Sequence, residues 1–231
     1  MRFGKTLVKT RFIERRNRFC VVLKLQGQEV KAHLANSGRL RELLVPGCTA
    51  YCSPASSPNR KTGWDLRLVE VETGIMVSVD ARLPNALFKE AFLGGKLPCF
   101  SEYASIEAEV TAGDSRFDFQ LTGTGQPCWV ETKSITLVKG MTGLFPDAKT
   151  LRGTRHVQHL TALKQSGARA AVIFIVQRSD AEFVRPNDAS DPVFGEALRE
   201  AVSCGVEVFA ARCRVELEGV WWDASLPVRW D

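Results

Sequence analysis

Three side chains that could hold a divalent cation and assist phosphodiester hydrolysis occur in the middle of the chain: Asp118, Glu131 and Lys133. Side chains alternate between the two faces of a strand, so Glu131 and Lys133 would point to the same side. Asp118 lies on the polar face of the alternating segment 116–121, and antiparallel neighbours bring opposed side chains within about 5 Å. We therefore expect the three side chains to converge.

The pattern suits a metal-dependent hydrolytic site. Two carboxylates can bind Mg²⁺, which prefers oxygen ligands, and the same ligands suit Mn²⁺. A neighbouring lysine can position an attacking water and balance phosphate charge. The backbone carbonyl of Thr132 is a further predicted ligand, and Glu109 on the segment 106–110 could supply a third carboxylate. The alternative is a surface ion pair on an exposed sheet face, which would contribute little to stability.

A polar helix face is predicted to follow the carboxylate–lysine segment. The pattern favours a helix from about 147 or 150 to 165, on which Arg152 and His156 are four residues apart and share a face. Arg152 could bind a phosphate, and His156 could do so when protonated or could hydrogen-bond a carboxylate. Asp147 would either cap the helix or lean into the site. Alternatively, Arg152 and His156 are ordinary surface groups of an amphipathic helix.

Further candidate phosphate-binding residues lie in the N-terminal third of the chain. Basic side chains crowd the first eighteen residues and are opposed there only by Glu14. They indicate either a surface that follows phosphates or a solvated basic edge. The turn 36–39 and the Pro/Ser-rich loop 53–61 carry more polar groups. The DNA- or phosphate-binding candidates of this part are Asn36, Arg39, Arg15, Arg16, Arg18, Arg60 and Lys61.

The elements that would position these residues form two regions. Residues 1–83 contain about five short predicted strands, which suggest a small barrel with an OB-like barrel as one candidate. The strands are expected at 19–25, 30–34, 49–53, 64–72 and 75–79. Residues 84–231 are expected to form a mixed α/β domain. Its expected elements are helices at 85–92, 147 or 150–165 and 192–204 and strands at 106–110, 116–121, 128–135, 170–176 and 206–211.

Composition narrows the classes of protein. The chain has 231 residues, 45% of them hydrophobic and 25% charged, which is typical of a globular protein. Its net charge of +5 suits a nucleic-acid partner without requiring one. Seven cysteines without a CxxC pair favour free thiols in a reducing compartment. No apolar run is long enough for a membrane span and no signal-peptide pattern follows Met1, so no membrane association and a cytoplasmic location are expected.

Several short sequence blocks, taken together, resemble one known family, the sugar fermentation stimulation protein A family. The likeness covers nearly the whole chain, and the set is specific although each block alone is weak. One small departure is Ser37, where many members have Thr, and it keeps the hydroxyl. The blocks are Ala35-Asn36-Ser37-Gly38-Arg39, Val45-Pro46-Gly47, Asn59-Arg60-Lys61-Thr62, Arg116-Phe117-Asp118-Phe119, Val130-Glu131-Thr132-Lys133-Ser134, Phe145-Pro146-Asp147-Ala148 and Arg152-Gly153 with His156.

The resemblance implies an N-terminal OB-like β-barrel (1–83) and a C-terminal PD-(D/E)xK restriction-endonuclease-like α/β domain (84–231). It also implies sequence-nonspecific DNA binding and a regulatory link to sugar (maltose) metabolism. The acidic–lysine positions of the family carry over onto Glu109, Asp118, Glu131 and Lys133. Three hypotheses follow: a Mg²⁺-dependent DNA nuclease, a DNA-binding regulator without turnover, and an interaction protein without a nucleic-acid partner. Many nucleases of this fold type dimerise, so a homodimer is a further expectation by analogy.

Overall fold

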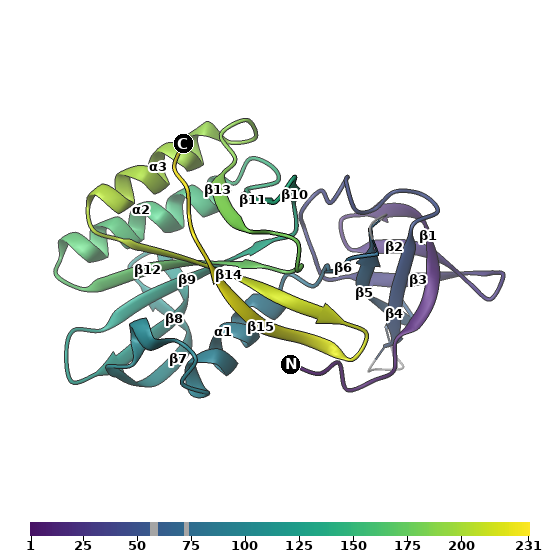
Figure 1. Cartoon of the computed structure of the whole chain (residues 1–231), viewed down its shortest axis with the longest axis horizontal. Helices are drawn as coiled ribbons and strands as arrows, with labels where there is room; N and C mark the ends of the chain where they lie inside the picture. Colours follow the sequence, from purple (N-terminus) through teal and green to yellow (C-terminus); the bar gives the residue numbers. More distant parts are fainter. Residues whose placement is uncertain (56–59, 72–73) are drawn as a thin grey trace.

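The N-terminal part of the computed structural model, which describes residues 1–55, 60–71 and 74–231, is a closed β-barrel (Figure 1). Five strands close the barrel in the order β1–β2–β3–β5–β4 and back to β1, with β3 and β5 parallel and the other pairs antiparallel. A sixth strand, β6, pairs antiparallel with β5. The strands are β1 (Val8–Asn17), β2 (Cys20–Leu25), β3 (Gln28–Leu34), β4 (Thr49–Pro54), β5 (Trp64–Glu70) and β6 (Met76–Ser78).

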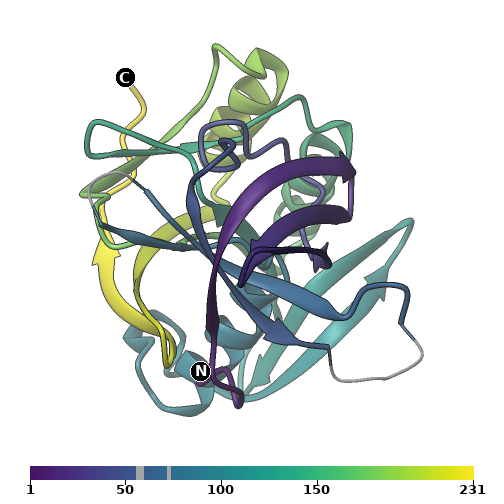
Figure 2. The ribbon, with the colours of Figure 1, turned by 90° about the vertical axis from the view of Figure 1, so that its right-hand side faces the viewer.

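The barrel confirms the OB-like expectation, with one strand more than the sequence indicated. Strand β1 was missed because it carries most of the basic N-terminal residues, whose charges hide the alternation. Thr10 and Phe12 point into the barrel, while Lys9 and Arg11 point outward. Figure 2 views the barrel from its outer side, where β1 curves across the front. Most of the basic segment is thus a strand of the barrel whose charged side chains face outward.

The second part is a mixed α/β domain built on a six-stranded sheet, as expected. The strand order is β15–β14–β12–β9–β8–β7, with β9, β12 and β14 parallel and the outer pairs antiparallel. The strands are β7 (Tyr103–Ala112), β8 (Ser115–Gly123), β9 (Cys128–Ile135), β12 (Arg169–Val176), β14 (Glu207–Glu216) and β15 (Gly219–Leu226). The helices are α1 (Leu83–Leu93), α2 (Leu151–Gln165) and α3 (Pro192–Ser203), with a 3₁₀ turn at Pro98–Phe100.

Helices cover both faces of this sheet. In Figure 1, α2 and α3 lie above it and α1 lies below it. The buried strand β12 shows the reason, because its side chains alternate between two apolar cores. Ile173 and Ile175 pack with Phe88 of α1, whereas Val172 and Phe174 pack on the α2 and α3 side. The nearly continuous apolar run of β12 is typical of a strand buried on both faces.

Two features of the second part were not predicted from the sequence. Strand β15 forms an antiparallel hairpin with β14 at the sheet edge. A small three-stranded sheet combines β10 (Val138–Lys139), β11 (Thr142–Phe145) and β13 (Phe183–Pro186). Strands of two to four residues carry too little alternation to be recognised. The small sheet matters because β11 leads directly to Asp147 and the start of α2.

The chain crosses between the two parts twice. The segment between β6 and α1 is one crossing, and it brings the amide of Ser78 to the carbonyl of Gln177 (3.0 Å). The N-terminus is the other, since the amino group of Met1 donates to the carbonyl of Val220 (2.6 Å) in the β14–β15 hairpin. In the described ranges, no helix has both the length and the apolar character needed to cross a membrane.

Candidate active site

Glu131 on the central strand β9 lies at the centre of a buried polar cluster. Its Oε1 accepts hydrogen bonds from Lys133 Nζ (2.6 Å) and His156 Nδ1 (2.5 Å). Its side chain is only 5% exposed and that of Lys133 is 11% exposed. Burial alone would raise the pKa of Glu131, but the Lys133 ammonium and the His156 ring outweigh it and hold that pKa below its usual value. Glu131 is therefore an anion at neutral pH.

Asp118 on β8 is held by donors from two other elements. Its Oδ2 accepts from the backbone amide of Thr132 (2.8 Å) and from the Thr132 hydroxyl (2.9 Å), and its Oδ1 accepts from Asn85 Nδ2 of α1 (2.8 Å). Burial and then the nearby charge of Glu131 raise the pKa of Asp118 above its usual value. The predicted convergence of Asp118, Glu131 and Lys133 is thus present in the structure.

Two residues of this cluster have contacts that the sequence did not indicate. Thr132 was expected to offer only its carbonyl to a metal, but its amide and hydroxyl orient Asp118. Asn85 was not singled out at all, although it links Asp118 to the Thr132 hydroxyl (Oγ1 to Asn85 Oδ1, 2.5 Å). A polar residue in the otherwise apolar first turn of helix α1 was the available signal.

The two carboxylates fit a hard divalent cation. Oε2 of Glu131 is buried and has no hydrogen-bond partner among the residues that the structure describes. A buried charged oxygen without a donor is costly unless something else balances it. Across the described ranges no three His, Cys, Asp or Glu side chains are arranged as metal ligands. Two carboxylates nevertheless suit Mg²⁺, which binds one or two of them and keeps several waters.

Glu109 lines the same cavity, but its carboxylate is engaged elsewhere. In the pairing of β7 and β8 it falls between the pairs Ala108–Phe119 and Val110–Phe117. Its Oε2 pairs with Arg116 Nε (2.8 Å), and its side chain is half exposed. Its φ is +60°, in the left-handed region that is strained for a residue with a Cβ. Glu109 as a third carboxylate of the site therefore stays a prediction.

Helix α2 delivers His156 and Arg152 to the site. The Thr150 hydroxyl caps the helix by accepting from the amide of Gly153 (3.1 Å). His156 is buried, so it is not an ordinary surface group. Arg152 Nε lies 3.4 Å from His156 Nε2 and donates to it. Because the ionised Glu131 can only accept, His156 Nδ1 donates to it. Arg152 itself is exposed at the rim of the cavity.

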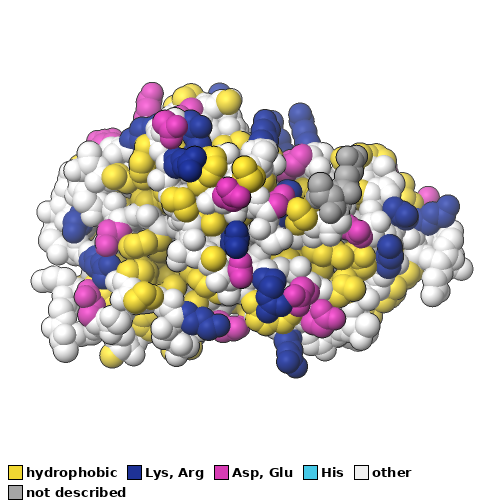
Figure 3. Space-filling model, in the orientation of Figure 1, with side chains coloured by type: hydrophobic (Ala, Val, Ile, Leu, Met, Phe, Trp, Pro, Cys, Tyr) yellow, Lys and Arg dark blue, Asp and Glu magenta, His cyan; other side chains and the backbone are white. Residues whose placement is uncertain are grey.

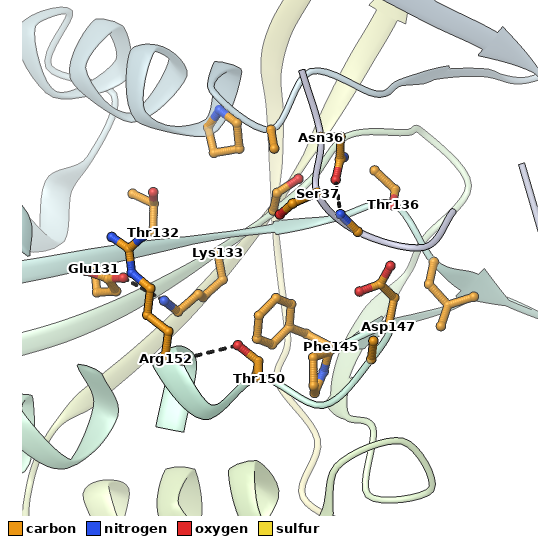
Figure 4. Close-up of a pocket in the computed structure, with 18 of the residues that line it drawn as sticks. Asn36, Ser37, Glu131, Thr132, Lys133, Thr136, Phe145, Asp147, Thr150 and Arg152 are labelled. Carbon is orange, nitrogen blue, oxygen red and sulfur yellow. Dashed lines mark hydrogen bonds and ion pairs between the residues drawn. The ribbon is translucent and has the colours of Figure 1, made fainter. Parts of the chain in front are cut away.

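The cluster opens into a cavity of about 620 Å³ that both parts of the protein line. Figure 4 shows Glu131, Lys133 and Arg152 on one side of it and Asn36 and Ser37 of the barrel on the other. The turn 36–39, expected at the sequence level as a polar loop, therefore forms a wall of the site. Phe145, Asp147 and Thr150 line its lower edge in this view.

The wall from the barrel, residues 36–40 (the 36–40 loop), is held in place by hydrogen bonds. Asn36 Oδ1 accepts from the amide of Gly38 (2.8 Å), and Asp147 Oδ2 accepts from the amide of Arg39 (2.9 Å). A Cβ on Gly38 would lie 2.8 Å from Asp147 Oδ2, so a larger residue here would displace this carboxylate from the Arg39 amide. The Arg15 guanidinium donates to the carbonyls of Arg18, Asn36, Gly38 and Arg39.

The remaining predicted phosphate-binding residues lie on the barrel in varied settings. Arg16 pairs with Glu14 (2.9 Å) on the surface, and Arg60 pairs with the buried Asp65 (2.7 Å). Exposed side chains are those of Arg18, Arg39 and Lys61. Figure 3 shows one face of the whole molecule, on which Lys and Arg side chains are spread out and mixed with acidic ones. In this structure Arg15 supports the 36–40 loop, and its predicted phosphate contact, like the others, stays a prediction.

Comparison with known proteins supports this description over the whole chain. Two family models match, one described as "SfsA N-terminal OB domain" at residues 13–79 and one as "Sugar fermentation stimulation protein RE domain" at residues 82–219. Sugar fermentation stimulation protein homologues from Moorella thermoacetica and Acetivibrio thermocellus are 48% and 45% identical, over 91% and 94% of this chain and of their own lengths.

A solved structure is also similar along its full length. It is described as Pyrococcus furiosus SfsA in complex with Ca²⁺ and is 31% identical, with a TM-score of 0.91 and 99% of each chain covered. The match includes the barrel and the α/β domain together, so the resemblance read from the sequence blocks is confirmed. This chain belongs to the sugar fermentation stimulation protein family.

Proposed function

We propose that the protein binds DNA and hydrolyses phosphodiester bonds at the cavity between its two parts, with a divalent cation held by Asp118 and Glu131. The observation that carries the proposal is the buried Glu131 Oε2, which has no hydrogen-bond donor in the described part of the chain, while Oε1 accepts from both Lys133 and His156. A divalent cation there would offset phosphate charge and activate an attacking water. The Ca²⁺ complex of the Pyrococcus furiosus relative supports a cation-binding site in this fold.

The side chains around the carboxylates have separable roles in the proposed reaction. Lys133 Nζ is a buried ammonium beside Glu131 and can bind the phosphate oxygen that becomes more negative. Asn85 and Thr132 orient Asp118, and His156 orients Glu131. Arg152 at the cavity rim can bind a neighbouring phosphate through two parallel hydrogen bonds. Together they would fix the scissile group and balance its charge.

The second candidate is a DNA-binding regulator that uses the same cavity without turnover. The relatives are named for stimulation of sugar fermentation, which describes an effect on metabolism and not a reaction. Lys133 also has its ammonium bonded to Glu131, so a phosphate would have to compete for it. A regulator of sugar (maltose) metabolism genes needs only to bind DNA, so it does not require Lys133 to act in catalysis.

One experiment separates the two candidates. Supercoiled, linear and single-stranded DNA are incubated with purified protein and Mg²⁺ or Mn²⁺, beside Asp118→Ala and Lys133→Ala. Exposed Lys96, which does not line the cavity, supplies the matched control Lys96→Ala. Metal-dependent cutting that is lost in both site variants and kept in the control supports the nuclease. Binding without any cutting by the wild type favours the regulator.

A further inference from the structure

The Glu131 carboxylate at the centre of the site and the His156 ring bonded to it are buried and do not lie on an open surface. The side chains of Glu131 and His156 are 5% and 8% exposed. A duplex is stiff, with a persistence length of about 50 nm, and it carries its phosphates on the outside of a rod. A phosphate within an intact duplex cannot descend to these groups without bending or opening. A single strand can, because its backbone is flexible.

The entrance is restricted by the barrel. The 36–40 loop forms one wall, and the segment from the end of β11 to the start of α2 forms the opposite one (Figure 4). The hydrogen bond from the amide of Arg39 to Asp147 joins the two walls. Arg15 holds the loop through its carbonyls, so the loop is not free to swing aside. This contact between the two parts therefore holds the two walls together.

The lining offers two kinds of contact side by side. Lys133 and Arg152 supply positive charge, while apolar side chains occupy the same cavity. Phe145 belongs to the wall formed by the end of β11 (Figure 4), where one part of its ring packs against Phe174 and Phe194 of the core and the rest lines the cavity. An unpaired nucleotide presents an apolar base face together with a phosphate, and stacking of a base on an aromatic ring is worth about 1–3 kcal/mol. A paired base keeps its faces inside the duplex. The apolar members of the lining include Leu40, Pro84, Leu144, Phe145 and Pro146.

From depth, entrance and lining we infer that the site takes an unpaired nucleotide, so that its substrate is single-stranded DNA or an unpaired end or flap, and not an intact duplex. This inference rests on the proposed function. OB-like barrels commonly bind single strands through aromatic and basic side chains, and here the barrel contributes a wall of the site itself. The contact between Asp147 and Arg39 then acts as the selectivity element.

The test compares one labelled strand with the same strand in a blunt duplex, at equal salt and with Mg²⁺. We expect the wild type to cut the single strand at least about tenfold faster. Asp147→Ala removes the acceptor that joins the walls, so the ratio of duplex to single-strand cutting should rise at least about threefold. Asp223→Ala, which breaks the exposed pair with Arg212 far from the cavity, should leave the ratio unchanged. Equal cutting of strand and duplex by the wild type overturns the inference while the proposed function stands.

Binding decides the matter if no DNA is cut. Fluorescence anisotropy with Ca²⁺ then compares the affinity of the wild type for the two DNAs. Tighter binding of the single strand that weakens in Arg152→Ala supports an unpaired nucleotide in the cavity, although hydrolysis has failed. Equal or tighter binding of the duplex refutes the inference. An unchanged ratio in Asp147→Ala refutes the selectivity element.

Discussion

The same kind of substitution should have opposite effects on stability at the two carboxylates of the site. Glu131→Gln removes the charge that Lys133 and His156 both contact, and the pKa of Glu131 is lowered by those contacts. Asp118→Asn removes a charge whose pKa is raised by burial and by Glu131. A group with a lowered acid pKa stabilises the folded state when ionised, and one with a raised pKa destabilises it.

The hydrogen bonds around each carboxylate allow the change in stability to be estimated for each substitution. In Glu131→Gln the buried Lys133 ammonium loses its anion, which costs about 3 kcal/mol, or about 6–12 °C in Tm for a protein of this size. In Asp118→Asn every hydrogen bond survives if the amide of Asn85 rotates by half a turn. The new amide then donates to Asn85, Asn85 donates to the Thr132 hydroxyl, and Thr132 donates to the remaining oxygen.

Thermal unfolding in EDTA at pH 7.5 measures both effects without a bound metal. We expect a clear fall in Tm for Glu131→Gln and an unchanged or higher Tm for Asp118→Asn. Circular dichroism of each variant at 20 °C controls for the fold. A fall of similar size in both variants would refute the reasoning, because it would show that both carboxylates stabilise the metal-free protein.

Three further predictions concern the metal, the thiols and the loop. A divalent cation at about 100 times its Kd should stabilise the wild type by about 2.7 kcal/mol, seen as a rise in Tm, and should not stabilise Glu131→Gln. The thiols of Cys52, Cys128 and Cys213 are buried, and burial raises their pKa to about 12. They should not react with iodoacetamide at pH 8, whereas the exposed thiol of Cys99 should. Because the buried thiols ionise more easily when unfolded, stability should fall as the pH rises above 9; a flat profile would contradict this. Arg15→Ala should lower stability by about 1.5–3 kcal/mol and speed hydrogen exchange in the 36–40 loop; unchanged exchange would contradict its bracing role.

The parts of the fold that the sequence predicted well are those with strong local signals. Strand β9 matches the expected range 128–135, and α3 begins at the expected cap, where the Asp191 side chain accepts from the amide of Phe194. Strand β1 was missed because charges hide its alternation. The strands of the small sheet were missed because they are only two to four residues long, and because β11 and β13 pair across about 40 residues of sequence.

The candidate site divides in the same way. Asp118, Glu131 and Lys133 were predicted to converge because two neighbouring strands fix their positions, and the structure brings them together. The contact of the 36–40 loop with Asp147 spans 108 residues between the two parts, and no local pattern reports it. The basic surface predicted from the sequence likewise did not indicate that the Arg15 guanidinium would donate to backbone carbonyls.

Single-turnover cleavage with enzyme in excess over labelled single-stranded DNA tests metal-dependent hydrolysis at this cavity most directly. Wild-type protein and Lys133→Ala are compared in Mg²⁺ and in EDTA, with DNA binding measured on the same preparations so that a contaminating nuclease is recognised. We expect cutting by the wild type in Mg²⁺ only, and at least about a hundredfold loss in Lys133→Ala with binding kept. Equal cutting by both proteins, or cutting in EDTA, would contradict hydrolysis at this site.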